Sequence, residues 1–218
     1  MSNSGMEKPL ETEKRGRSYG GVAPEVRAAE RHDALIRAAT RVFGTVGFRK
    51  ATVRSICQEA KLNDRYFYAA FAGTEDLLRC TYLYHAQQLH DAVAAAVAAR
   101  GGDLRARIDA GLGAFFRFLR DPCAARVLLL EVMGVSADTD ATYQRMLVDF
   151  GKLIMAIGAP RAPRTAAQRT EHRLIGLALV GAMTNVGAAW LLTGYRDPEA
   201  RMVASCRKVL LGTLQAVA

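Results

Sequence analysis

The sequence predicts an all-α fold, with a small three-helix unit near the N-terminus and a larger helical bundle after it. Apolar residues recur at helical spacing from about residue 25 onward, and short breaks rich in Gly, Pro, Asp and Asn separate the helical segments. No run of alternating β-branched residues bounded by turn signals appears. Half of the 218 residues are hydrophobic, which is enough to bury a core without disulfides or metals.

The three-helix unit is expected between residues 24 and 73. Its first helix covers about Glu25 to Val46 and ends at Gly47, because Gly tolerates the left-handed conformation common after helices. A short second helix follows Thr52 and a short third helix follows Asn63, since both side chains can cap a helix N-terminus. Each helix carries one apolar stripe, and the three stripes can bury one another. The stripes consist of Leu35, Ala38, Ala39, Val42 and Phe43; of Val53, Ile56, Cys57 and Ala60; and of Phe67, Ala70 and Phe71.

Residues 74–218 are expected to form the bundle from longer helices. Gly101-Gly102 ends the first of them, and the Pro-rich segment 158–164 separates the last two from the others. The expected start signals are, in chain order, Thr74, Asp103, Asp121-Pro122, the capping box Thr165 to Gln168, and Asp197-Pro198. Residues 1–23 have no apolar period, so we expect a flexible tail. Its basic residues could act as a minor-groove arm, although nearby Glu and Ser residues dilute them; they are Lys8, Lys14, Arg15 and Arg17.

Basic side chains are concentrated in the three-helix unit. The chain has a formal net charge of +9, from 30 Lys and Arg against 21 Asp and Glu. Residues 31–65 alone contribute eight basic and three acidic side chains. Such a local excess is typical of a surface that binds a polyanion such as nucleic acid. A solvated basic face is the alternative that charge alone leaves open.

The second and third helices, joined by a tight turn at Lys61-Leu62, form a helix-turn-helix pattern. In this motif the apolar faces hold the second helix at a fixed angle, and its first side chains are free to meet base edges in the major groove. Asn63, Asp64, Arg65 and Tyr66 occupy those positions. Arg65 can donate two hydrogen bonds to guanine, whereas Asn63 can either pair with adenine or cap the helix.

These residues agree in register with a known family pattern: Arg37-Ala38-Ala39 with Val42-Phe43, Gly47-Phe48, Thr52-Val53 with Ile56, Ala60, Tyr68 with Phe71, and Glu75 with Leu77-Leu78. Over about residues 30–80 the chain thus resembles the TetR family of bacterial transcriptional regulators. The resemblance implies that residues 52–71 are the DNA-reading motif and that Tyr68 and Thr52 contact backbone phosphates. It also implies that the later helices dimerise and hold a small-molecule pocket, and that repression is the commoner mode of action.

Three positions depart from the family pattern. Lys61 replaces a turn Gly, Ala70 replaces a His, and Thr74 replaces a Lys that contacts phosphate. A non-Gly residue at positive φ costs on the order of 1 kcal/mol. Arg49, Lys50 or Arg54 could replace the phosphate contact that Thr74 lacks. The expected DNA-binding residues are Thr52, Arg54, Lys61, Asn63, Asp64, Arg65, Tyr66 and Tyr68.

A charge-free run of 22 residues, Leu174 to Tyr195, has the length of a membrane span. It contains several Gly, Thr and Asn residues and follows amphipathic helices typical of a soluble bundle. The last two helices are apolar over more than one face, which a monomer would leave exposed to water. We therefore expect a homodimer through these two helices in preference to membrane insertion.

A ligand pocket is expected among the bundle helices, although aromatic and Met residues at helical spacing more often form ordinary core. Glu131 and Asn185 are isolated polar groups; Glu131 could equally face solvent, and Asn185 could equally serve a dimer partner. The expected pocket residues are Phe115, Phe116, Glu131, Met133, Met146, Phe150, Met183, Asn185 and Trp190.

No motif indicates an enzyme, a cofactor or a metal site. The sequence has no metal-protease, nucleophile-elbow, phosphate-loop or dinucleotide-binding pattern. Cys80, His85 and His90 are five residues apart, a spacing that turns ligands around a helix and suits no shared ion. The four cysteines form no close pair, which fits a cytoplasmic location. A DNA-binding regulator is therefore expected; a helical small-molecule carrier and a membrane-associated helical protein are the alternatives.

Overall fold

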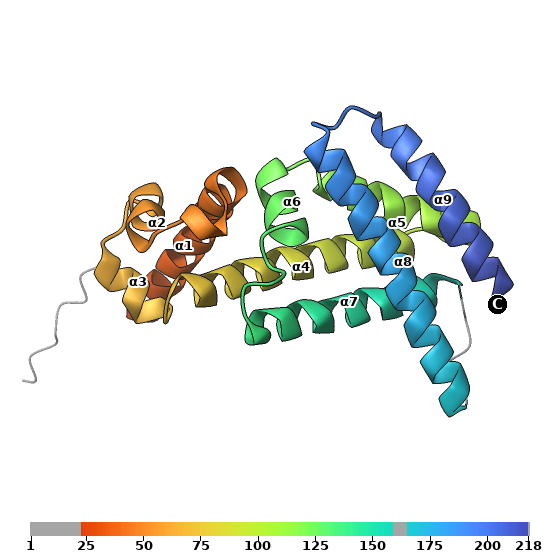
Figure 1. The fold of residues 1–218 in the computed structure, drawn as a ribbon, viewed down its shortest axis with the longest axis horizontal. Helices are drawn as coiled ribbons and strands as arrows, with labels where there is room; N and C mark the ends of the chain where they lie inside the picture. The colour runs from red at the N-terminus through yellow and green to blue at the C-terminus, as the bar shows by residue number, and fades with distance from the viewer. Residues whose placement is uncertain (1–22, 159–164, 218) are drawn as a thin grey trace, which may run out of the picture.

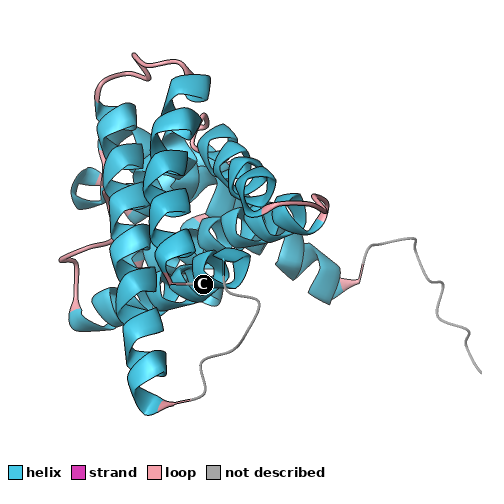
Figure 2. Ribbon diagram, turned by 90° about the vertical axis from the view of Figure 1, so that its right-hand side faces the viewer, coloured by secondary structure: helices cyan, strands magenta, loops and turns pink. Residues whose placement is uncertain are grey.

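The computed structural model describes residues 23–158 and 165–217, and every regular element in these ranges is a helix (Figures 1 and 2). The predicted all-α fold is confirmed. The helices are α1 (Pro24–Val46), the short 3-10 helix η1 (Phe48–Lys50), α2 (Val53–Ala60), α3 (Asp64–Ala70), α4 (Thr74–Ala98), α5 (Leu104–Phe118), α6 (Pro122–Leu129), α7 (Ala137–Gly158), α8 (Ala166–Leu192) and α9 (Glu199–Ala216). The four basic residues proposed for a minor-groove arm, and linker residues 159–164, lie outside the described residues.

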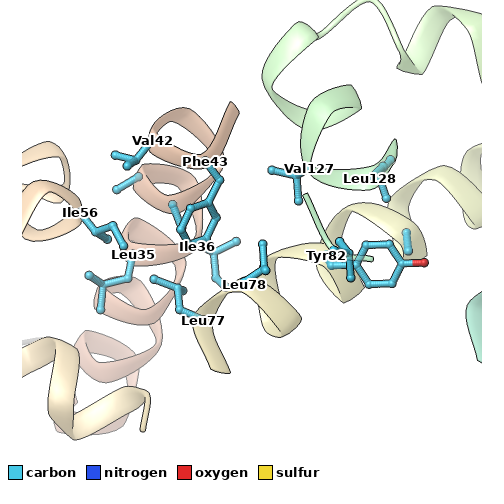
Figure 3. Close-up of a cluster of buried hydrophobic side chains, with 14 of the residues drawn as sticks. Leu35, Ile36, Val42, Phe43, Ile56, Leu77, Leu78, Tyr82, Val127 and Leu128 are labelled. Carbon is cyan, nitrogen blue, oxygen red and sulfur yellow. The ribbon is translucent and has the colours of Figure 1, made fainter. Parts of the chain in front are cut away.

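Helices α1, α2 and α3 bury their predicted stripes against one another. Leu35, Phe43, Ile56 and Phe67 are all 0% exposed and belong to one apolar cluster. The cluster continues into α4 through Leu77 and its neighbours, and into α6 (Figure 3). The small N-terminal unit therefore shares its core with the first half of α4 and one face of α6.

Two local predictions around α3 and α4 are wrong. Ala70 is exposed, because α3 ends at this residue and the chain bends there to bring Phe71 inward instead. Thr74 does not cap α4: Gly73 is the N-cap residue, Thr74 is the first helical residue, and no side chain caps this end. The side chain of Asp76 reaches back to accept a hydrogen bond from the Ala72 backbone N–H at 3.1 Å.

The second core cluster lies in the bundle, among α5, α6, α7, α8 and α9. Phe116 and Trp190 meet edge to face in it, with ring centroids 5.4 Å apart. Helices α7 and α8 cross at Gly151 and Gly176, where a Cβ on Gly151 would come within 3.1 Å of the Gly176 backbone. These two glycines allow the close crossing.

The long α4 connects the two ends of the molecule (Figure 1). Helices α2 and α3 lie at one end, and α8 and α9 lie at the other. Helix α6 packs between α1 and α8 and also contacts α4. This layout separates a candidate DNA-reading surface from α8, which carries most of the charge-free run, and joins them through α4 and α6.

Candidate nucleic-acid interface and ligand cavity

The turn between α2 and α3 is built on a left-handed lysine. Lys61 has φ 55° and ψ 38°, its N–H bonds to the Gln58 carbonyl at 3.2 Å, and the Leu62 N–H bonds to the Cys57 carbonyl at 3.0 Å. This pair of bonds is the Schellman arrangement that ends a helix at a residue of positive φ. The structure thus keeps the tight turn although Lys stands where Gly would be less strained.

Both short helices are capped by their own side chains. Thr52 Oγ1 accepts a hydrogen bond from the Ser55 N–H, and Ser55 Oγ accepts one from the Thr52 N–H, each at 3.1 Å. Asn63 Oδ1 accepts from the Arg65 N–H at 2.8 Å. The Asn63 oxygen is therefore committed to the cap, which is one of the two roles that the sequence left open for this residue.

Helix α3 is anchored by one side chain and exposes most of the others. Phe67 is 0% exposed, whereas Tyr68 is 63% and Tyr66 is 42% exposed. Arg65 and Asp64 are exposed as well. Burying a Phe side chain contributes about 1.5–3 kcal/mol, enough to fix the orientation of so short a helix. The α3 side chains that could meet DNA thus project outward from a buried anchor.

The expected DNA-binding residues fall into two groups on this surface. One group lines a hollow between α2 and α3, with Val53, Cys57, Gln58 and Leu62 completing its wall; its members are Arg54, Lys61, Asn63, Asp64 and Tyr68. The other group, Thr52, Arg65 and Tyr66, is exposed outside the hollow. Arg54 and Lys61 give the hollow two cationic groups against the single carboxylate of Asp64.

Arg31 of α1 also reaches this surface, although it was not among the expected contacts. Its guanidinium carbon lies 4.7 Å from the ring centroid of Tyr66, a cation–π distance. Sequence spacing cannot show this contact, because the two residues are 35 positions apart and the sequence does not specify the angle at which α1 and α3 cross. Arg41, another residue of the basic region, forms an ion pair with Glu59 of α2 and is committed to holding α1 against α2.

An apolar cavity of about 80 Å³ lies in the bundle. Phe115, Phe150 and Met183 of the expected pocket residues line it. Phe116 and Trp190 are buried in the core nearby, and the Trp190 indole N–H donates to the Asp197 carbonyl at 2.8 Å. Met133, at 65% exposed, faces solvent, and neither Met146 nor the exposed Asn185 lines the cavity.

Glu131 lies at the junction between the N-terminal unit and α6, away from the cavity. Its Oε2 accepts from the Phe48 backbone N–H at 2.7 Å, and its Oε1 accepts from Arg126 Nε at 2.6 Å. The carboxylate therefore ties η1 to α6. Leu128 and Leu129, which precede Glu131 by three and two residues, line the cavity.

Comparisons with known proteins match one part of the chain to a family and most of the chain to a fold. The family model described as bacterial regulatory proteins, tetR family, matches residues 35–80. The chain matches no curated protein. Solved structures with the same fold include the fatty acid degradation regulator FadR from Bacillus halodurans, with TM-score 0.72 and 19% identity over 88% of this chain and 97% of that one.

Two further structures have similar scores. FadR from Bacillus subtilis, solved in complex with stearoyl-CoA, has TM-score 0.67 and 15% identity over 82% of this chain and 97% of that one. A TetR-like transcriptional regulator from Rhodococcus sp. RHA1 has TM-score 0.64 and 19% identity over 86% and 94%. Residues 35–80 thus match the model of the TetR family of bacterial transcriptional regulators, and the chain has the fold of these solved regulators.

Proposed function

We propose that the protein is a homodimeric, sequence-specific DNA-binding repressor that a small-molecule effector releases from a palindromic operator in the cytoplasm. The observation that carries this proposal is the capped helix α3, which is held by the buried Phe67 and exposes Arg65, Tyr66 and Tyr68. Two copies of α3 would enter successive major grooves about 34–36 Å apart. The family whose model matches residues 35–80 consists of regulatory proteins, which argues against an enzymatic function.

The side chains suggest a division of roles at the operator. Arg65 would donate to guanine, and Tyr66, the next residue, lies under the Arg31 guanidinium. Tyr68, Arg54 and Lys61 line the hollow beside α3 and suit backbone phosphates. Thr52 and Asn63 fix the two helix starts, and Asp64 can accept from a cytosine amine. The remaining boundaries, with a tail over 1–23 and a DNA-binding domain over 24–73, are part of the proposal.

Helices α8 and α9 support the proposed dimer. The exposed side of α8 is a stripe of mostly small or apolar residues at steps of three and four, and α9 presents a second one. They consist of Leu174, Ala178, Gly181, Asn185, Ala189 and Leu192, and of Ser205, Val209, Gly212 and Ala216. A Cβ added at Gly181 or Gly212 would meet nothing within 4 Å, so a partner helix could approach closely.

By length and composition alone, α8 could also cross a membrane. Of its most apolar 18-residue stretch, 33% is buried inside the molecule. Its exposed stripe contains Gly and Asn, which suits a helix–helix seam better than lipid contact. Ala178→Glu would introduce a charge into the seam, and we expect light scattering to show a monomer where the parent is a dimer. Ala95→Glu on an exposed position of α4 is the control and should stay dimeric.

The apolar cavity and a solved relative support the effector. Bacillus subtilis FadR was solved with stearoyl-CoA, so at least one protein of this fold binds a ligand with a long apolar part. In the present protein the cavity adjoins α6, which contacts α1. Release from DNA needs only that the ligand binds one arrangement of these helices more tightly than the other, typically by about 1–3 kcal/mol.

Titration of duplex DNA with increasing salt tests the DNA-binding role. The DNA upstream of the protein's own coding region is the first probe, because an inverted repeat there would be the operator. We expect affinity to fall steeply with salt, and Tyr68→Phe and Arg65→Ala to weaken binding. Arg105→Ala, an exposed change on α5, is the matched control. Variants of Tyr68 and Arg65 that bind as tightly as the control would show that α3 does not read DNA.

A further inference from the structure

Among the residues that the structure describes, none that lines the bundle cavity carries a carboxylate, ammonium or guanidinium group. Its lining comes from α4 to α9 and consists of aliphatic and aromatic side chains with three hydroxyl-bearing residues, Tyr82, Tyr143 and Thr184. Transferring a charged group into such a site carries a large desolvation penalty that no lining residue offsets. The walls therefore select for an uncharged ligand that is mostly hydrocarbon.

The three hydroxyl groups do not have equal freedom to bind a ligand. Thr184 Oγ1 donates to the carbonyl groups of Val180 and Gly181 at 3.0 and 3.1 Å, so its proton is used within α8. Among the described residues, the hydroxyl groups of Tyr82 and Tyr143 have no hydrogen-bond partner. Both phenols thus keep an unused donor beside the cavity.

Tyr82 and Tyr143 form a pair across α4 and α7. Their ring centroids are 6.0 Å apart, and Tyr82 is only 3% exposed. Figure 3 shows the Tyr82 ring extending away from the labelled residues of α1 and its hydroxyl oxygen at the far end. Burial raises the pKa of both phenols, with Tyr143 adding to the effect at Tyr82, so both remain protonated donors at neutral pH. Neither hydroxyl oxygen is among the fully buried atoms without a partner, so both oxygens remain accessible, and a ligand acceptor can receive their hydrogen bonds.

We infer that the cavity binds an uncharged, largely hydrocarbon ligand whose carbonyl, ester or ether oxygen accepts hydrogen bonds from Tyr82 and Tyr143. Describing this ligand as the effector rests on the proposed function, whereas the binding itself does not. The inference adds a chemical class to the cavity and assigns the selectivity for that class to two residues on different helices.

A matched series of eight-carbon compounds tests the inference by calorimetry on the full chain. The first compound is 2-octanone, which has an acceptor and no charge. The second is octane, which has no acceptor and no charge, and the third is octanoate, which is charged. We expect 2-octanone to bind more tightly than the other two. Tyr82→Phe and Tyr143→Phe should each weaken 2-octanone binding roughly 3- to 10-fold and leave octane binding unchanged. Tyr84→Phe is the control, since Tyr84 is a 43% exposed tyrosine of the same helix outside the cavity.

Each outcome decides the question. Octanoate binding as tightly as 2-octanone, or 2-octanone binding that neither Phe variant weakens while thermal unfolding shows both to be folded, would overturn the inference. Failure of all three compounds to bind would overturn it too. Parallel DNA titrations separate this from the proposed function: loss of ligand binding with intact salt-dependent DNA binding refutes only the ligand class. If the protein binds the ligand but does not bind DNA, only the proposed regulatory function is refuted.

Discussion

Replacing Glu131 by Gln tests whether the tie between η1 and α6 holds the two parts of the molecule together. The Glu131 side chain is 11% exposed and accepts from the Phe48 N–H at 2.7 Å and from Arg126 Nε at 2.6 Å. A hydrogen bond to a charged group is worth about 1.5–3 kcal/mol. The Arg126 side chain is 40% exposed, so solvent screens much of its share. We therefore expect Glu131→Gln to lower the free energy of unfolding by about 2 kcal/mol.

Glu59→Gln is the matched control, because Glu59 also pairs with an arginine, Arg41 of α1, but its side chain is 42% exposed. An exposed pair of this kind contributes about 0–1 kcal/mol. Urea unfolding followed by circular dichroism measures both variants, at one protein concentration because dimerisation would couple to stability. Equal losses for the two variants would refute the reasoning that burial makes the Glu131 tie the stronger one.

Three further changes test other parts of the structure. Gly176→Ala places a Cβ 3.0 Å from the Gly151 backbone carbonyl oxygen and should lower the free energy of unfolding by about 1–3 kcal/mol in the same urea assay; a stabilised variant would contradict the close crossing. Burial lowers the pKa of His85, so the unfolded chain takes up a proton at this residue at a higher pH than the folded chain does. The free energy of unfolding should therefore fall as pH drops through about 6.5, and His85→Gln should flatten that profile. Arg31→Ala should weaken DNA binding and reduce its salt dependence, and an unchanged salt slope would place Arg31 off the DNA.

Local signals carried most of what the sequence predicted correctly. Asn63, Asp103 and Asp121 cap the helices that they were expected to start, and Thr165 with Gln168 forms the expected capping box. These contacts join residues two or three positions apart, so chain connectivity alone brings the partners together. The left-handed turn at Lys61 is local as well, since its backbone hydrogen bonds join residues between Cys57 and Leu62.

Long-range contacts account for what the sequence did not predict. Glu131 was expected near a ligand, but it meets Phe48, 83 positions earlier in the chain. Arg31 reaches Tyr66 only because α1 and α3 cross at a particular angle. Neither partner is implied by residue type or periodicity, because each depends on how whole helices pack. The cavity shows the same limit: periodicity identified apolar faces, and packing decided which of them leave space.

Helix α6 is where the two parts of the molecule meet, and its two faces explain how a ligand could affect DNA binding. Val127 is 0% exposed in the N-terminal core cluster, while Leu128 and Leu129 line the cavity. A Cβ on Gly44 of α1 would come within 2.4 Å of the Cys123 backbone, so α1 and α6 are in close backbone contact with little room to slide. Since packed interfaces shift between discrete arrangements rather than deform gradually, a ligand that displaces Leu128 or Leu129 would have to move α1 as well. Because α3 is packed on α1 through Phe67, we expect that movement to change the spacing of the two DNA-reading helices in the proposed dimer.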